Sequence, residues 1–142
     1  GWEKYDQLRA INTNSKRVFI AMSFDPLLKP IEQAIVSACS ECYFNAFRVD
    51  SQEHTDKICD KIIADIKGSR FVVADFTQNK RGVYFEAGFA LGLRLPVIWT
   101  CKDEEKEKER LHFDTRQYNH IFWRDAEDLK RQLINKINAI IK

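Results

Sequence analysis

The sequence predicts an α/β domain in which helices cover both faces of a parallel β-sheet. Five short segments are apolar at nearly every position, as expected of strands that are buried on both faces. Segments with apolar residues three and four apart alternate with them, as in strand–helix–strand units. The 142 residues are 44% hydrophobic and 31% charged, which suits one folded core and excludes global disorder.

The first half of the chain is predicted to contain three strands and two helices. The apolar run at residues 17–23 is the first strand, and residues 30–42 form a helix whose initial proline suits a first turn. A short strand at residues 45–49 precedes a helix at residues 58–67, which a glycine stops. The third strand, at residues 70–75, follows at once.

The second half is predicted to complete the sheet. After a polar loop, residues 83–93 have helical spacing, and residues 96–100 form the fourth strand. The charged residues 102–110 indicate a solvated loop or an exposed helical turn. Residues 120–123 form the fifth strand, and an amphipathic helix at residues 126–140 follows an aspartate that suits the N-cap. Right-handed crossovers then give a flavodoxin-like three-layer fold with the strand order 2-1-3-4-5.

Residues 1–16 are predicted to form an N-terminal helical lead-in or linker ahead of the domain at residues 17–142. The start at Gly1 fits a piece of a longer protein that carries an additional domain. No apolar run approaches the roughly 20 residues needed to cross a bilayer, and the polar N-terminus lacks the core of a signal peptide. We therefore expect a cytoplasmic protein without membrane association.

Charge and motifs exclude several function classes. The 23 Lys and Arg residues nearly balance the 21 Asp and Glu residues, so no basic face for a nucleic acid polymer is expected. Neither a dinucleotide fingerprint nor a Walker loop is present, which disfavours hydride transfer and NTP hydrolysis, and no cofactor is predicted. Cys39 and Cys42 form a C-x-x-C near a helix end, without a second pair at zinc spacing. We therefore interpret the four cysteines as reduced, mostly buried thiols and predict no metal site.

The ligand crevice is expected beyond the carboxyl ends of strands 1 and 3, where the strand order reverses. The loops after these strands begin at Ser23 and Asp75. Asp75 ends an apolar strand at the mouth of the crevice, where partial burial raises the pKa of a carboxyl group. Glu86 is expected in the first turn of a helix, whose N-terminus favours the ionised form.

Two carboxyl groups of this kind meet the needs of glycosidic bond cleavage. The charged one attacks or stabilises the sugar cation, and the other assists the leaving base. In the structural alternative, Asp75 braces the following loop and Glu86 only favours the helix dipole. Spacing alone favours this structural alternative.

Four motifs carry a resemblance to a known family: residues 18–25, 48–50, 73–77 and 79–90. In their order and spacing they resemble the nucleoside 2-deoxyribosyltransferase superfamily, especially its small bacterial branch with a V-Y-x-E-x-G-x-A signature. The likeness runs from about residue 17 to residue 123. It implies a flavodoxin-like domain in which Glu86 attacks the anomeric carbon and forms a covalent glycosyl-enzyme. Asp75 would match the family's Asp that contacts and helps protonate the departing base.

One position departs from the family pattern. Lys80 stands where the family's transferases carry an Asp that holds the sugar hydroxyls, six residues before the catalytic Glu. With Arg81 and Arg48, Lys80 suits a phosphorylated substrate and hydrolysis rather than transfer. Related TIR-type domains share the strand order and a helix-borne Glu that cleaves the nicotinamide bond of NAD, and some of them act as effectors or sensors in bacterial defence.

We therefore predict N-glycosidic bond cleavage or transfer on a nucleoside, nucleoside monophosphate or NAD, with Glu86 and Asp75 as catalytic residues. The predicted substrate-binding residues are Ser23, Phe24, Arg48, Asp50, Thr77, Asn79, Lys80, Gly82 and Tyr84. The two aromatic residues among them fit base stacking and core packing equally. A nucleotide-binding sensor without turnover and an interaction scaffold without ligand remain open alternatives. A homo-oligomer is compatible with the resemblance, because the family commonly completes its site with a neighbouring chain.

Overall fold

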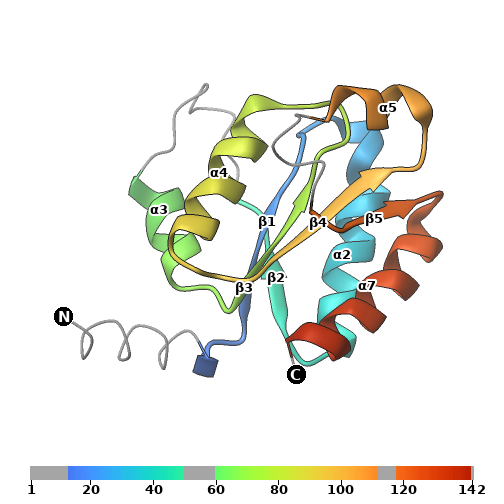
Figure 1. Cartoon of the computed structure of the whole chain (residues 1–142). Helices are drawn as coiled ribbons and strands as arrows, with labels where there is room; N and C mark the ends of the chain where they lie inside the picture. The colour runs from blue at the N-terminus through green and yellow to red at the C-terminus, as the bar shows by residue number, and fades with distance from the viewer. Residues whose placement is uncertain (1–12, 50–59, 112–117, 142) are drawn as a thin grey trace.

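The computed structural model describes residues 13–49, 60–111 and 118–141. Figure 1 shows its central five-stranded sheet, in which every paired strand is parallel and the order is β2-β1-β3-β4-β5. The strands are β1 (Arg17–Ala21), β2 (Asn45–Phe47), β3 (Phe71–Asp75), β4 (Val97–Lys102) and β5 (His120–Trp123). The predicted fold class and strand order are confirmed.

The helices form the two outer layers of the domain. They are the 3-10 turn η1 (Pro26–Leu28), α2 (Lys29–Glu41), α3 (Asp60–Lys67), α4 (Arg81–Gly92), α5 (Glu105–Arg110) and α7 (Ala126–Ile140). In Figure 1, α2 and α7 lie side by side on one face of the sheet, whereas α3 and α4 cover the other face. The short helix α5 lies near the carboxyl end of β4.

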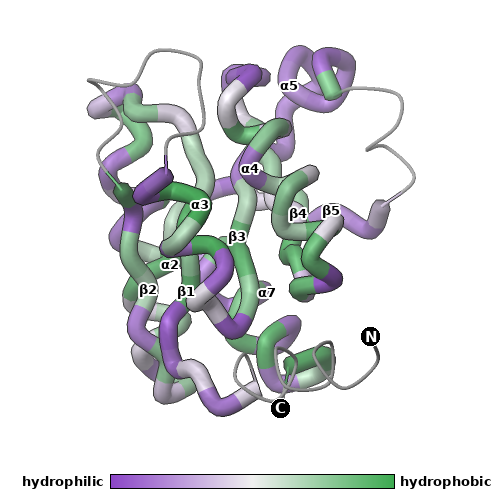
Figure 2. The backbone as a smooth tube through the Cα atoms, turned by 90° about the vertical axis from the view of Figure 1, so that its left-hand side faces the viewer, coloured by the Kyte–Doolittle hydropathy of each residue, from purple (hydrophilic) through white to green (hydrophobic). Residues whose placement is uncertain are grey.

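The central strand β3 is buried on both faces, and all of its residues are buried. Val73 belongs to the core cluster beneath α2 and α7, and the adjacent Val72 belongs to the cluster beneath α3 and α4. This two-sided burial explains why the strand is an uninterrupted apolar run rather than an alternating one. Figure 2 shows hydrophobic residues along β3 and mostly hydrophilic ones along α5.

Three expectations need correction or lie outside the described residues. Helix α4 begins at Arg81 rather than at residue 83, so Gly82 lies inside the helix and not before it. The charged stretch was expected to be solvated, but Glu107 is only 7% exposed because its carboxylate turns toward the β3–α4 loop. Residues 1–12, with most of the predicted lead-in, and Asp50 lie outside the described residues.

The described cysteines Cys39, Cys42 and Cys101 are buried thiols that form no disulfide, as predicted. Burial raises the pKa of Cys39 and of Cys101 to about 12, so both thiols stay protonated at neutral pH. Within residues 13–49, 60–111 and 118–141, no group of three or more His, Cys, Asp or Glu residues is arranged to hold a metal ion. No helix in these ranges combines the length and the apolar character that a membrane span requires.

Candidate functional site

The loops after β1 and β3 lie next to each other at the carboxyl edge of the sheet. The two strands pair in parallel as far as Ala21 and Ala74, so both chains leave the sheet at the same edge. The hydroxyl group of Ser23 donates a hydrogen bond of 2.7 Å to Oε1 of Gln78, which joins the two loops. This edge is the switch point where open α/β sheets bind ligands.

The carboxyl group of Asp75 is fully buried and joins the ends of three strands. Its Oδ1 accepts a hydrogen bond from the backbone N–H of Thr77 at 3.0 Å. Its Oδ2 accepts hydrogen bonds from Oγ1 of Thr100 at 2.6 Å and from Nε1 of Trp123 at 2.8 Å. Burial raises the pKa of Asp75, while the hydrogen bonds from Thr100, Thr77 and Trp123 oppose that change.

The raised pKa of Asp75 agrees with the sequence prediction, but the predicted position at the mouth of the crevice is wrong. The residue is 0% exposed. A buried indole N–H and a buried hydroxyl group each need an acceptor, and this carboxyl group supplies it. Its contacts are those of the structural alternative, in which it braces the loop, and a direct role in catalysis stays a prediction.

The carboxyl group of Glu86 differs from that of Asp75 in both burial and hydrogen bonding. It is half-buried in the second turn of α4, and it makes no hydrogen bond or ion pair within the described part of the chain. Burial raises the pKa of Glu86 to about 7. The expectation that the helix N-terminus keeps it ionised is wrong, because α4 begins earlier than predicted and the influence of a helix terminus fades beyond the first turn.

Phe24 and Arg48 form a pair beside the β1 loop. The guanidinium carbon of Arg48 lies 4.3 Å from the centroid of the Phe24 ring. Nη1 of Arg48 donates a hydrogen bond of 2.9 Å to the carbonyl oxygen of Ser23, and Nη2 lies 3.3 Å from Oε1 of Glu32. The structure thus brings three predicted binding residues together. Glu32, which the sequence analysis missed, supplies the countercharge.

Tyr84 points away from Glu86. The two residues are two positions apart in α4, so their side chains leave opposite sides of the helix. The Tyr84 ring packs on Phe76 with centroids 4.7 Å apart, and its hydroxyl group donates a hydrogen bond of 2.7 Å to Oδ1 of Asn79. Thr77 also faces inward, because its Oγ1 accepts a hydrogen bond of 3.0 Å from the backbone N–H of Lys102. These contacts are typical of packing, and base stacking by Tyr84 stays a prediction.

Lys80 and Gly82 flank the start of α4. Lys80 is exposed and occupies the N-cap position in an extended conformation without a side-chain cap. An added Cβ at Gly82 would meet nothing within 4 Å, so this position does not require glycine for space. The predicted substrate contacts of both residues stay predictions, as does the role of Asp50 outside the described residues.

Three polar residues that the sequence analysis missed meet at the same edge. Nε2 of Gln78 donates a hydrogen bond of 2.6 Å to Oδ2 of Asp25, and the backbone N–H of Gln78 donates one of 2.7 Å to Oε2 of Glu107. Hydrogen bonds from Leu27 and Gln78 hold the pKa of Asp25 below its usual value. Only the Asp-Pro turn at Asp25 leaves a signal in the sequence.

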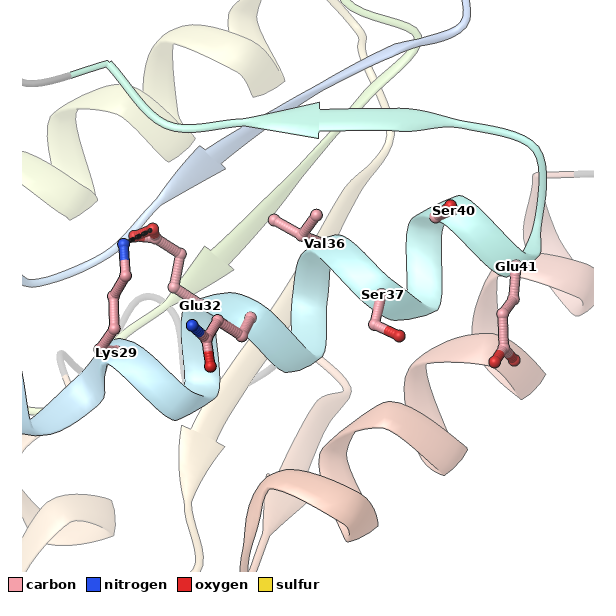
Figure 3. Close-up of a pocket in the computed structure, with 7 residues that line it drawn as sticks. Lys29, Glu32, Val36, Ser37, Ser40 and Glu41 are labelled. Carbon is pink, nitrogen blue, oxygen red and sulfur yellow. Dashed lines mark hydrogen bonds and ion pairs between the residues drawn. The ribbon is translucent and has the colours of Figure 1, made fainter.

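A groove on the exposed face of α2 is separate from the two predicted ligand loops. It has a volume of about 450 Å³ and is drawn in Figure 3, with Lys29, Glu32, Gln33, Val36, Ser37, Ser40 and Glu41 along its lining. All seven residues belong to α2. Neither Glu86 nor Asp75 lines this groove, so it does not belong to the predicted crevice.

No protein-family model matches the sequence, and no curated protein matches it. Among solved structures, the chain is similar to the TIR domains in the structure of the activated Roq1 resistosome directly recognizing the pathogen effector XopQ. The two chains share 19% sequence identity with a TM-score of 0.54, over 86% of this chain and 83% of that chain. This likeness shows a TIR-like fold. Membership of the nucleoside 2-deoxyribosyltransferase superfamily stays a prediction.

Proposed function

We propose that the domain cleaves the N-glycosidic bond between nicotinamide and ribose in NAD, with Glu86 as the nucleophile. The observation that carries this proposal is the half-buried carboxyl group of Glu86, which has no partner among the described residues and a pKa raised to about 7. An unpaired carboxyl group with a perturbed pKa near a ligand crevice is a feature of catalytic sites. The TIR-like fold supports the same proposal, because the resemblance of the sequence extends to TIR-type domains that cleave NAD with a helix-borne Glu.

The burial of Asp75 favours NAD over a neutral nucleoside. A purine or pyrimidine that leaves a neutral nucleoside is assisted by a proton from a general acid. Asp75 is fully buried, and its oxygens accept three hydrogen bonds, so it does not face a ligand in this arrangement. The nicotinamide ring of NAD carries a positive charge and leaves as a neutral molecule without gaining a proton. Asp75 then acts by holding the loop in place.

The proposed reaction proceeds in two steps. The ionised carboxylate of Glu86 attacks C1′ of the ribose, and the C1′–N bond breaks with its electron pair moving to the ring nitrogen of nicotinamide. Water then attacks C1′ of the glycosyl ester, which releases ADP-ribose and a proton and restores the carboxylate. With a pKa of about 7, Glu86 is partly ionised at neutral pH, and the positive charge of the substrate favours the ionised form further.

The test compares wild type with Glu86→Gln on NAD, deoxyadenosine and its monophosphate, with the released base measured by chromatography. We expect nicotinamide release by wild type and at least about a hundredfold loss in the variant. Glu127→Gln is the matched control, because Glu127 is exposed on α7 on the other face of the sheet. If NAD raises the melting temperature but neither protein releases nicotinamide, the domain is a sensing module instead. Base release from deoxyadenosine alone would favour the deoxyribosyltransferase prediction. Assembly into a homo-oligomer stays a prediction that sedimentation can test.

A further inference from the structure

We propose that Gln78 is a positioning residue that fixes the separation of the two ligand loops and thereby sets the affinity for ligand, while leaving the chemical step to Glu86. The predicted effect of Gln78 on the affinity for ligand rests on the proposed function. The effect on the loops rests on the contacts of Gln78 alone.

Gln78, in the loop after β3, forms hydrogen bonds with two segments that are far from it in the sequence. Its side chain accepts a hydrogen bond from Ser23 and donates one to Asp25, and both residues belong to the loop after β1. Its backbone N–H donates to Glu107 of α5. Asp25 in turn accepts a hydrogen bond of 2.9 Å from the backbone N–H of Leu27 and so caps η1. The half-buried side-chain amide of Gln78 therefore joins the β3 loop to the β1 loop, and its backbone N–H joins the β3 loop to α5.

The chemistry of these partners requires an amide. The carboxylate of Asp25 only accepts hydrogen bonds, and its low pKa keeps it ionised at neutral pH, so it needs the N–H of the amide. The hydroxyl group of Ser23 donates a hydrogen bond to Oε1, the carbonyl oxygen of the same Gln78 side-chain amide. A carboxylate of the same shape at position 78 has no donor and repels Asp25.

The backbone at this point depends on these contacts. Gln78 has φ 71° and Asn79 has φ 53°, so two consecutive residues other than glycine adopt the left-handed conformation. Such residues keep this conformation only where the surrounding structure holds them. Without the contacts of the Gln78 side chain, we expect the loop to relax toward other conformations.

Displacement of the β1 loop would reach the Phe24–Arg48 pair directly. The Ser23 carbonyl oxygen accepts the hydrogen bond of Arg48, whose guanidinium group lies over Phe24. Glu86 makes no hydrogen bond or ion pair with this group or with any other described residue. Loss of Gln78 should therefore raise KM for NAD more than it lowers kcat.

The test exchanges the charges of Gln78 and its hydrogen-bond partner Asp25. Gln78→Glu places two carboxylates together, whereas the double variant Asp25→Asn/Gln78→Glu restores the net charge and reverses the direction of the hydrogen bond. The first readout is amide hydrogen exchange of residues 23–28 without ligand, which does not depend on any enzymatic activity. The second readout is KM and kcat for NAD.

We expect Gln78→Glu to speed exchange in residues 23–28 about tenfold and to raise KM about tenfold with kcat within twofold, and the double variant to restore both. If the single variant does not fold, recovery of the folded state in the double variant supports the pairing of Gln78 with Asp25. A double variant that also fails to fold overturns the proposal. Unchanged exchange and unchanged KM in the single variant overturn the proposal. If exchange follows the expected pattern but wild type releases no nicotinamide, the loop positioning stands and the proposed function fails.

Discussion

Replacing Glu86 by glutamine is expected to stabilise the domain at alkaline pH while it removes the proposed activity. The folded state holds the Glu86 proton more tightly than the unfolded chain, because burial raises the pKa from 4.5 to about 7. The contribution of this group to stability is therefore complete below about pH 4.5 and is lost as the pH rises through about 7. Glutamine does not ionise, so the variant does not lose stability at this position as the pH rises.

The size of the effect follows from the pKa change. A change from 4.5 to about 7 corresponds to about 3 kcal/mol of unfolding free energy, and solvent screening of a half-buried group reduces this to nearer 2 kcal/mol. The stability difference between Glu86→Gln and wild type should be near zero at pH 4.5 and approach this value at pH 8. The buried carboxyl group of Asp75 is present in both proteins, so its own titration cancels in the difference.

Urea unfolding at several pH values between 4.5 and 8.5 measures this difference, with fluorescence as the signal. Glu127→Gln should show no gain in stability over wild type as the pH rises, because Glu127 is exposed. Parallel pH profiles for wild type and Glu86→Gln would refute the reasoning. A glutamine variant that is less stable than wild type at pH 8 would refute it as well, since it would mean that an unseen partner stabilises the carboxylate.

Two further outcomes are expected. Asp75→Asn should lower the unfolding free energy by about 2 kcal/mol, because either orientation of the amide places N–H against a buried N–H donor. A double-mutant cycle with Trp123→Phe should give a coupling of about 1 kcal/mol, and additive effects would contradict the hydrogen bond. Arg48→Lys should raise KM for NAD about fivefold with kcat nearly unchanged, because an ammonium group does not reach the Phe24 ring, the Ser23 carbonyl oxygen and Glu32 together as the guanidinium group does. Arg124→Lys, on an exposed residue, is the control, and equal KM values for both variants would exclude this role.

Most of the fold could be predicted because its signals are local. Apolar runs marked the buried strands, and β5 begins and ends where the sequence predicts it. The predicted N-cap Asp125 accepts a hydrogen bond of 2.8 Å from the backbone N–H of Asp128. The start of α4 was less predictable, since Lys80 offers no side-chain cap to mark it. That small error placed Glu86 in the first turn, where the ionised form is favoured, whereas burial raises its pKa.

The sequence by itself determined which elements form, in which order they lie in the sheet and which loops meet at its carboxyl edge. Periodicity and turn residues act over a few positions, so they can be read along the chain. The tertiary structure alone decided that Trp123 donates to Asp75 across 48 positions and that Gln78 joins Asp25 across 53 positions. It also decided the burial that separates the surroundings of Asp75 and Glu86, because desolvation depends on every neighbour packed around a group and not on its place in the sequence.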